Sequence, residues 1–256
     1  MPTLRFIPIL IAVVCAEWCT AQAAIIVNSA LPVDRQVVVQ FVQARETNGT
    51  SPATVFGDAT QRSAIEAMLD QIWAQAGIDI SILPTITPYN SSFALDRNNN
   101  TSGDRPIGDF DTIFVQAAAA GVLNNGNVIN AIFVDYVPGF SILSENSAGG
   151  LASLPGDQIT MFTGDSLLTF ATGREAIASV FAHEIGHNLG LNHIGTDDNL
   201  MAAFSASSER LNASQIGTAR SSNLLRVIPE PGAAWLIGVS LALVGARRTR
   251  KAGSGI

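Results

Sequence analysis

All three histidines of this 256-residue chain lie within eleven positions, from His183 to His193. His183 and His187 are four residues apart, so on a helix both imidazoles project from the same face. That spacing lets two neutral ring nitrogens reach one Zn²⁺ ion at about 2.0–2.1 Å. Glu184 is poorly directed to bind the same ion, but it can reach a water on the metal and take its proton. The pattern predicts a zinc site, with ordinary buried histidines as the alternative.

Gly190 and His193 extend the pattern. Gly190 follows His187 by three residues, where a helix needs a left-handed residue in order to end. The chain can then turn back and bring His193 to the same ion. Three protein ligands leave one coordination position open, which is the arrangement of a catalytic zinc rather than a structural one.

The segment 183–193 resembles the extended zinc signature of the metzincin metalloproteases, H-E-x-x-H-x-x-G-x-x-H, at every fixed position. The resemblance implies a zincin-like catalytic domain, a metalloendopeptidase activity on protein or peptide substrates, and Glu184 as the catalytic base. It also implies a Met-turn beneath the metal, for which Met201 is the candidate. Ile194 and the two alanines after Met201 differ from the residues that several metzincin families carry there. The sequence therefore indicates the clan and not one family within it.

The rest of the chain predicts an α+β (mixed α/β) domain with a twisted mixed sheet, an active-site helix and a small C-terminal subdomain beginning at His193. Strands are expected at 36–44, 78–83, 127–137 and 158–162, and helices at 59–76, 109–120, from 172 or 173 through the zinc motif, and 212–226. The active-site helix presents an apolar face of Ile177, Val180, Phe181 and Ile185 to the sheet, and Glu175 in its first turn complements the helix dipole.

A glycine-rich stretch, Gly149, Gly150, Leu151 and Ala152, precedes the last predicted strand. In metzincins the strand in this place lies at the sheet edge and pairs with the main chain of the substrate. Such pairing needs free backbone groups and little side-chain bulk, which this stretch offers. A plain connecting hairpin is the equal alternative.

Two polar stretches carry weaker signals. Residues 96–104 (DRNNNTSGD) carry oxygen-bearing side chains at alternate positions, as the start of a calcium-binding loop does. The glycine expected at the sixth position of such a loop and the glutamate expected at the twelfth are missing. A solvated loop is favoured, with a stabilising Ca²⁺ as the alternative. Asp197 and Asp198, between His193 and Met201, are either turn formers, which is favoured, or hydrogen-bond partners of a ligand imidazole.

Residues 1–23 are typical of a secretory signal peptide. Arg5 gives the positive start, residues 6–14 the apolar run, and Ala21-Gln22-Ala23 the small-x-small cleavage site. Cys15 and Cys19, the two cysteines of the chain, both lie in this segment. The catalytic domain expected at 24–226 therefore contains no cysteine and no disulfide.

Residues 227–256 resemble the PEP-CTERM sorting signal of bacteria. Pro229-Glu230-Pro231 precedes an apolar run at 233–245, and four basic residues follow at 247–251. The resemblance implies export, transient inner-membrane anchoring through a short transmembrane helix, and removal of the tail by a transpeptidase-like sorting enzyme. The apolar run is short for a free-standing span of about 20 residues, and an ordinary C-terminal anchor is the alternative.

The body of the chain is acidic. Residues 24–228 contain 9 basic and 19 acidic side chains, a net charge of −10. Such a surface disfavours nucleic acid or an anionic membrane as a partner, and a monomer is expected. Two alternatives to a secreted endopeptidase stay open: a surface or matrix protein that keeps zinc without catalysis, and a protein whose main substrate is itself.

Overall fold

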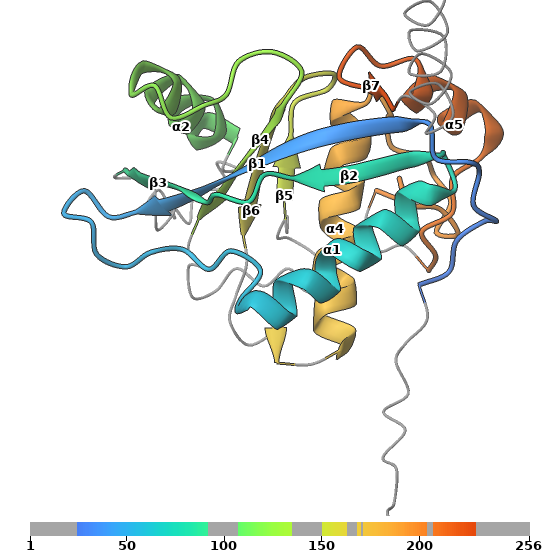
Figure 1. Cartoon of the computed structure of the whole chain (residues 1–256), viewed down its shortest axis with the longest axis horizontal. Coiled ribbons are helices and arrows are strands. Elements are labelled where there is room, and N and C mark those ends of the chain that lie inside the picture. The colour runs from blue at the N-terminus through green and yellow to red at the C-terminus, as the bar shows by residue number, and fades with distance from the viewer. Residues whose placement is uncertain are drawn as a thin grey trace, which may run out of the picture.

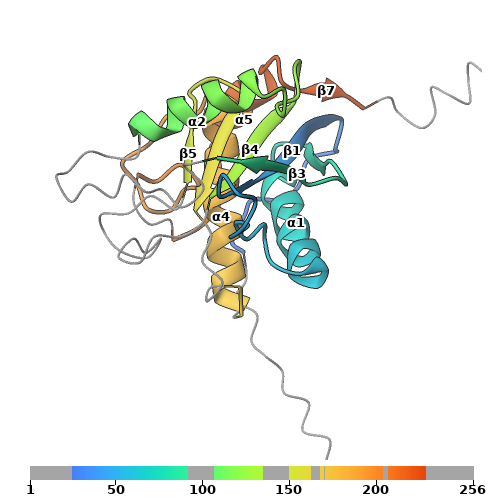
Figure 2. The ribbon, with the colours of Figure 1, turned by 90° about the vertical axis from the view of Figure 1, so that its left-hand side faces the viewer.

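The computed structural model describes residues 25–91, 107–134, 150–162, 168–169, 171–203 and 207–228. The domain is a mixed sheet with helices on both faces (Figures 1 and 2). The mixed α/β class expected from the sequence is confirmed. The strands are β1 (Arg35–Arg45), β2 (Ile78–Ile82), β3 (Thr87–Asn90), β4 (Ile129–Val134), β5 (Gly150–Ala152), β6 (Gln158–Phe162) and β7 (Arg226–Val227). The helices are α1 (Ala59–Ala74), α2 (Ile107–Ala119), α4 (Ala171–Asn188) and α5 (Ala213–Arg220).

Strand β1 is the centre of the sheet. The main path runs β2-β1-β4-β6-β5, and β3 and β7 pair with other parts of β1. Four pairs are parallel, namely β1 with β2, β3 and β4, and β4 with β6. Strand β5 is antiparallel to β6 and forms the edge, while β7 is antiparallel to β1. Parallel strands covered on both faces favour continuous apolar runs, as in the VVVQFV segment of β1.

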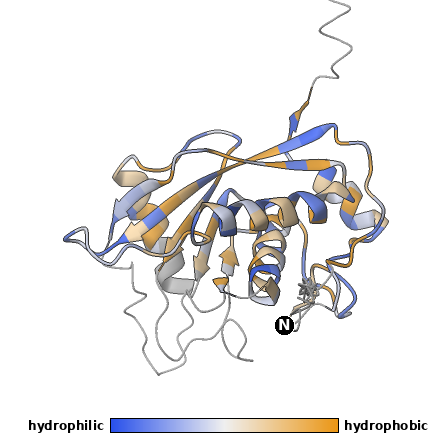
Figure 3. Ribbon diagram, turned by 60° about the horizontal axis from the view of Figure 1, so that its bottom comes forward, coloured by the Kyte–Doolittle hydropathy of each residue, from blue (hydrophilic) through white to orange (hydrophobic). Residues whose placement is uncertain are grey.

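The alternation of side chains along β1 separates two hydrophobic cores. Val37, Val39 and Phe41 pack with residues of α1 and α4, whereas Val42 and Ala44 pack with α2 on the opposite face. Figure 3 shows hydrophobic residues concentrated along the middle of the strands. The helix that carries two of the histidines therefore lies against the larger core.

Four phenylalanines fix α4 to the sheet. Phe41 of β1, Phe56, Phe133 of β4 and Phe181 of α4 are almost fully buried. Ring centroids of Phe41 lie 5.2 Å from Phe56, 4.9 Å from Phe133 and 5.9 Å from Phe181, each close to edge-to-face. Aromatic pairs in this geometry each contribute about 0.5–1.5 kcal/mol beyond their buried area. The cluster thus holds the helix rigidly at the level of Phe181, half a turn before His183.

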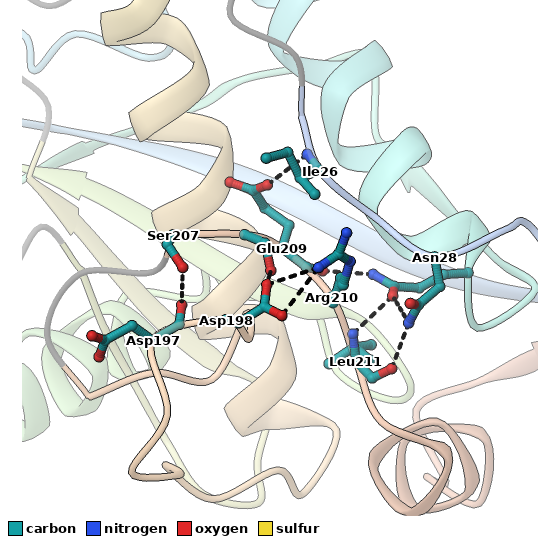
Figure 4. A network of polar contacts seen from close by, with 10 residues as sticks. Ile26, Asn28, Asp197, Asp198, Ser207, Glu209, Arg210 and Leu211 are labelled. Carbon is teal, nitrogen blue, oxygen red and sulfur yellow. Dashed lines mark hydrogen bonds and ion pairs between the residues drawn. The ribbon is translucent and has the colours of Figure 1, made fainter.

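The first and last described segments of the domain lie side by side (Figure 4). The backbone N–H of Ile26 donates to the Glu209 carboxylate, and the Asn28 side chain donates to the Leu211 carbonyl at 2.6 Å. Arg220 of α5 pairs with Asp34 at 2.8 Å, just before β1. Strand β7 then pairs with the start of β1. These contacts attach the C-terminal subdomain to the beginning of the sheet.

Several sequence-based expectations need correction. The last helix does not run to residue 226: α5 ends at Arg220, and the chain turns through Ser221 and Ser222, residue types that hydrogen-bond locally and weaken helices, before it forms β7. Helix α4 begins at Ala171, so Glu175 lies beyond its first turn. Helix α1 ends at Ala74 rather than at residue 76.

Some expectations fall outside the described residues. These are the signal peptide at 1–23, the calcium loop at 96–104, residues 135–137 of one expected strand, Gly149, and the sorting signal from residue 229 with its apolar run at 233–245. Within the described ranges, no helix has both the length and the apolar composition needed to span a membrane.

Candidate metal centre

Helix α4 brings His183 and His187 together on one face. The helix spans Ala171–Asn188, and the centroids of the two imidazole rings lie 4.7 Å apart. His187 is 8% exposed, and it follows the apolar residues Phe181 and Ile185 that pack against the core. Burial of the apolar side therefore aims both imidazoles in one direction.

Gly190 ends this helix and reverses the chain. Its φ is +91°, and the two hydrogen bonds of a Schellman motif are present: Gly190 N–H donates to the His187 carbonyl and Leu191 N–H to the Gly186 carbonyl, both at 2.9 Å. A Cβ at this position would approach nothing closer than Thr218 Cγ2 at 3.7 Å. The backbone conformation, and not a lack of space, is therefore what favours glycine here.

The turn returns His193 to the other two histidines. The Nε2 atom of His193 lies 3.1 Å from Nε2 of His183 and 3.1 Å from Nε2 of His187. Within the described residues these three form the one group of three or more histidine, cysteine or acidic side chains whose ligand atoms converge, all within 4.8 Å of one another. His193 is exposed, so one side of the cluster is open to solvent.

Backbone carbonyls fix the tautomers of the two helical histidines. The Nδ1 atom of His183 lies 2.7 Å from the Leu200 carbonyl oxygen, and Nδ1 of His187 lies 2.7 Å from that of Leu191. A carbonyl can only accept, so each Nδ1 carries the proton and donates it. Each Nε2 consequently presents a bare lone pair to the centre of the cluster, which is how a metal-binding histidine is prepared.

The donor set fits zinc. Tetrahedral coordination with Zn–N bonds of about 2.0–2.1 Å separates ligand nitrogens by about 3.3 Å, close to the 3.1 Å found here. The bare lone pairs of His183 and His187 Nε2 are thus placed where a cation could accept both. Burial lowers the pKa of His183 to about 4 and also lowers the pKa of His187, so both imidazoles are neutral near pH 7. These two histidines can therefore receive a metal ion without first losing protons.

Glu184 lies beneath the edge strand β5. It is 7% exposed, and burial raises the pKa of its carboxyl group to about 8. A Cβ placed on Gly150 of β5 would lie 2.8 Å from Cγ and 3.2 Å from Cδ of Glu184. The strand thus covers the stem of this side chain directly. A divalent cation at the adjacent histidines would favour the ionised carboxylate and lower its pKa again.

Met201 packs against α4 between the two helical histidines. It is fully buried, and its Sδ atom lies 2.5 Å from the position that a Cβ on Gly186 would occupy. Ile194 N–H donates to the Met201 carbonyl at 2.9 Å, so the turn that contains Met201 also contacts the residue after His193. The methionine therefore contacts the helix between its two ligand histidines from the C-terminal subdomain.

The stretch around Gly150 is a strand at the sheet edge. Gly150, Leu151 and Ala152 pair with β6, and no other described strand pairs with them. Asn188, the last residue of α4, donates from Nδ2 to the Ser153 carbonyl at 2.9 Å and to the Gln158 carbonyl at 3.2 Å. The sequence analysis missed Asn188, whose position directly after His187 was the one available signal. Its amide joins the β5–β6 hairpin to the metal-binding helix.

Asp197 and Asp198 belong to the loop that follows His193. The Asp197 carbonyl accepts from the backbone N–H and the hydroxyl of Ser207. The Asp198 carboxylate accepts from the Ser208 hydroxyl and from Arg210 Nη1, with both of its oxygens 3.0 Å from that nitrogen (Figure 4). The ligand imidazoles described above instead donate to main-chain carbonyls. These aspartates thus organise the loop.

Comparison with known proteins identifies the family. A model of the reprolysin-like metallopeptidases of family M12B matches residues 27–194, which include all three histidines and Glu184. A search of curated protein sequences found no match. Solved structures similar to this chain include the archaemetzincin of Methanopyrus kandleri (16% identity, 73% of this chain and 88% of that one, TM-score 0.38). Metalloproteinase-II of Bacteroides fragilis is also similar (12% identity, 77% of this chain and 56% of that one, TM-score 0.45). So is the archaemetzincin of Archaeoglobus fulgidus (15% identity, 72% of this chain and 99% of that one, TM-score 0.38).

The family match covers well over half of the chain and contains the whole histidine cluster. The geometry of that cluster fits zinc on independent grounds, because the three Nε2 atoms converge and those of His183 and His187 present bare lone pairs. The chain therefore belongs to the reprolysin-like metallopeptidases of family M12B, and it is a zinc-dependent peptidase that acts on protein or peptide substrates.

Proposed function

We propose that the protein is a secreted endopeptidase in which Glu184 is the general base. The observation that carries the proposal is the placement of this one carboxylate next to the histidine cluster. Glu184 directly follows His183 on α4 and is buried under β5. A structural zinc site has no use for such a group, since burying a carboxylate is costly.

The residues of the chain divide the work of hydrolysis. His183, His187 and His193 would hold zinc, which supplies Lewis-acid chemistry by polarising the scissile carbonyl and making water more acidic. A Glu184 carboxylate oxygen accepts a proton from the attacking water. The same oxygen then donates that proton to the nitrogen of the leaving amine as the C–N bond breaks.

Strand β5 supports an internal cleavage site. Among the described strands, residues Gly150–Ala152 pair with β6 on one side, and no described strand pairs with the backbone groups of the other side. An extended peptide can add to such an edge through main-chain hydrogen bonds, whatever its own side chains. Recognition along the main chain, rather than of a chain end, is what an endopeptidase requires.

The test compares wild-type protein with Glu184→Gln on a mixed peptide library, with bound zinc measured in parallel. The isosteric amide keeps the side-chain volume but cannot accept the proton, so turnover should fall about 10²–10⁴-fold while zinc stays at one per chain. A chelator should abolish wild-type cleavage and added Zn²⁺ should restore it. Substantial hydrolysis by Glu184→Gln would remove the general-base assignment. Inactive wild-type protein with tightly bound zinc would favour the catalytically silent alternative.

Export is supported by the two ends of the sequence. The signal-peptide pattern at 1–23 supports transfer across the inner membrane. The PEP-CTERM-like tail at 227–256 supports transient anchoring and removal of the tail by a sorting enzyme. Mass spectrometry of protein recovered outside the cell should give an N-terminus at Ala24 and a shortened C-terminus. Termini that change in Glu184→Gln would instead reveal self-processing.

A further inference from the structure

A pair of buried carboxamides lies behind the metal centre, outside the segment 27–194 that the family model matches. Asn199 and Gln215 are 4% and 8% exposed. Asn199 Nδ2 donates to Gln215 Oε1 at 2.9 Å, and Gln215 Nε2 donates to Asn199 Oδ1 at 3.0 Å. Because both amides donate and accept, the two planar groups form a closed, doubly hydrogen-bonded pair.

Each side-chain oxygen of the pair also accepts a backbone N–H. Oδ1 of Asn199 accepts from Met201 N–H at 2.9 Å, and Oε1 of Gln215 accepts from Asn212 N–H at 2.8 Å. The pair thus connects the turn that contains Met201 with the N-terminus of α5, where Asn212 and Gln215 form a capping box. Neither oxygen has an accepting position left for solvent, so the pair has one arrangement.

The turn held in this way carries the hydrogen-bond partner of a metal ligand. Leu200 lies between Asn199 and Met201, and its carbonyl accepts the Nδ1–H of His183 at 2.7 Å. Leu200 N–H donates to the Arg210 carbonyl at 2.9 Å, so the turn is held on both sides. A continuous chain of contacts therefore leads from the cap of α5 through the carboxamide pair and the Leu200 carbonyl to the His183 imidazole.

We infer that Asn199 and Gln215 are positioning residues of the metal centre, which fix the Leu200 carbonyl on His183 and Met201 against α4. The hydrogen bond on Nδ1 holds the ring orientation and keeps Nε2 directed at the ion, and loss of such partners typically weakens metal binding by 10–100-fold. The inference rests on the proposed hydrolytic function only for effects on turnover, since the primary effect of the Asn199–Gln215 pair is on metal binding.

The chain offers a matched control, because α1 has the same capping arrangement. Gln61 is the third residue of α1, its Oε1 accepts from Asp58 N–H at 2.8 Å, and its Nε2 donates to the Leu168 carbonyl at 3.0 Å. Gln61→Ala and Gln215→Ala therefore remove the same side chain from the same position of two capping boxes. Only Gln215→Ala removes a contact to the turn that contains Leu200 and Met201.

The experiment measures the dissociation constant for Zn²⁺ by competition with a chromophoric chelator, and the visible absorption spectrum of the Co²⁺-loaded full-length protein. Gln215→Ala and Asn199→Ala should each weaken zinc binding about tenfold or more and alter the Co²⁺ spectrum. Gln61→Ala should lower the melting temperature by a similar amount but keep zinc affinity within about twofold. The double variant Asn199→Ala/Gln215→Ala should weaken binding hardly more than either single variant, because the two residues act as one unit.

Equal zinc affinity and an unchanged Co²⁺ spectrum in Gln215→Ala would overturn the inference and leave the pair a simple helix cap. If Gln215→Ala does not fold, Gln215→Met provides the same test, since it keeps the side-chain volume and the apolar packing but loses all three side-chain hydrogen bonds. A wild-type protein that binds zinc but does not cleave peptides would contradict the proposed function alone. The effect of Gln215 on metal affinity would still be measurable in that protein.

Discussion

The contact between Gly150 and Glu184 allows a quantitative prediction. An ideal Cβ on Gly150 would lie 2.8 Å from Glu184 Cγ, 3.2 Å from Glu184 Cδ and 3.0 Å from Met161 Sδ. Ordinary contacts between carbon atoms are about 3.5–4.0 Å, so Gly150→Ala forces the Glu184 stem to move by several tenths of an ångström. Gly150 has no positive φ, and the substitution therefore tests space alone.

The expected cost follows from overpacking. Adding a methyl group to a well-packed site typically destabilises a protein by about 1–3 kcal/mol. Glu184→Ala removes Cγ and Cδ of Glu184, so of these three close contacts only the one with Met161 Sδ is left for a Cβ on Gly150. Met161 has a flexible side chain that can move away from the added methyl group. In the Glu184→Ala background the same glycine substitution should cost less than about 1 kcal/mol. The two substitutions are therefore expected to show a coupling free energy of about 1–2 kcal/mol.

The assay is urea-induced unfolding of the wild type, the two single variants and the double variant, all free of metal. Gly195→Ala is the control, because a Cβ there would meet nothing within 4 Å, and its effect should be close to zero. In the zinc-loaded protein Gly150→Ala should reduce kcat and leave zinc affinity unchanged. An equal cost of Gly150→Ala with and without the Glu184 side chain would refute the proposed contact.

Two further predictions concern the histidine cluster. Since burial lowers the pKa of His183 to about 4, from 6.5 in an unfolded chain, the unfolded state binds more protons between these values and stability falls as the pH is lowered. Glu184, whose pKa burial raises to about 8, acts in the opposite direction over this range, so the test compares metal-free wild type with metal-free His183→Gln. Between pH 7 and pH 5 the wild type should lose about 2 kcal/mol of unfolding free energy relative to His183→Gln, measured by urea titration. Gly190→Ala should destabilise by about 1–2 kcal/mol because of its φ of +91°, whereas Gly190→Asn should cost less, since asparagine tolerates this conformation. Equal costs for the alanine and asparagine variants in thermal unfolding would contradict a conformational origin.

The metal cluster could be predicted from the sequence because its information is local. The four-residue spacing of His183 and His187 has one meaning on a helix, and Gly190 marks the end of that helix through its chemistry alone. The parallel core strand β4 was also visible, as a continuous apolar run. In each case neighbouring residues in the sequence determine the structure, and no distant contact has to be known.

The remaining features depend on contacts between distant residues. Asn199 and Gln215 are 16 positions apart, and polar residues in a loop carry no periodicity that would connect them. Strand β7 has two residues and exists because β1 offers free backbone groups beside it. The sequence predicts that Gly150 offers little side-chain bulk toward a substrate, whereas the structure shows a tight contact between Gly150 and the buried Glu184 side chain. Such constraints can be recognised only once the packing is known.

We expect the contacts between the two ends of the domain to delay formation of the metal centre during synthesis. Ile26 and Asn28 form hydrogen bonds with Glu209 and Leu211, which lie 183 positions later in the chain. Asp34 forms an ion pair with Arg220. Contacts over such separations form late, because closing long loops costs chain entropy before the contacts can compensate it. The Leu200 carbonyl belongs to this subdomain, so we expect a growing chain that already contains all three histidines to lack the acceptor that holds His183. We therefore expect hydrolytic capacity to arise only after residues up to Arg220 have been synthesised.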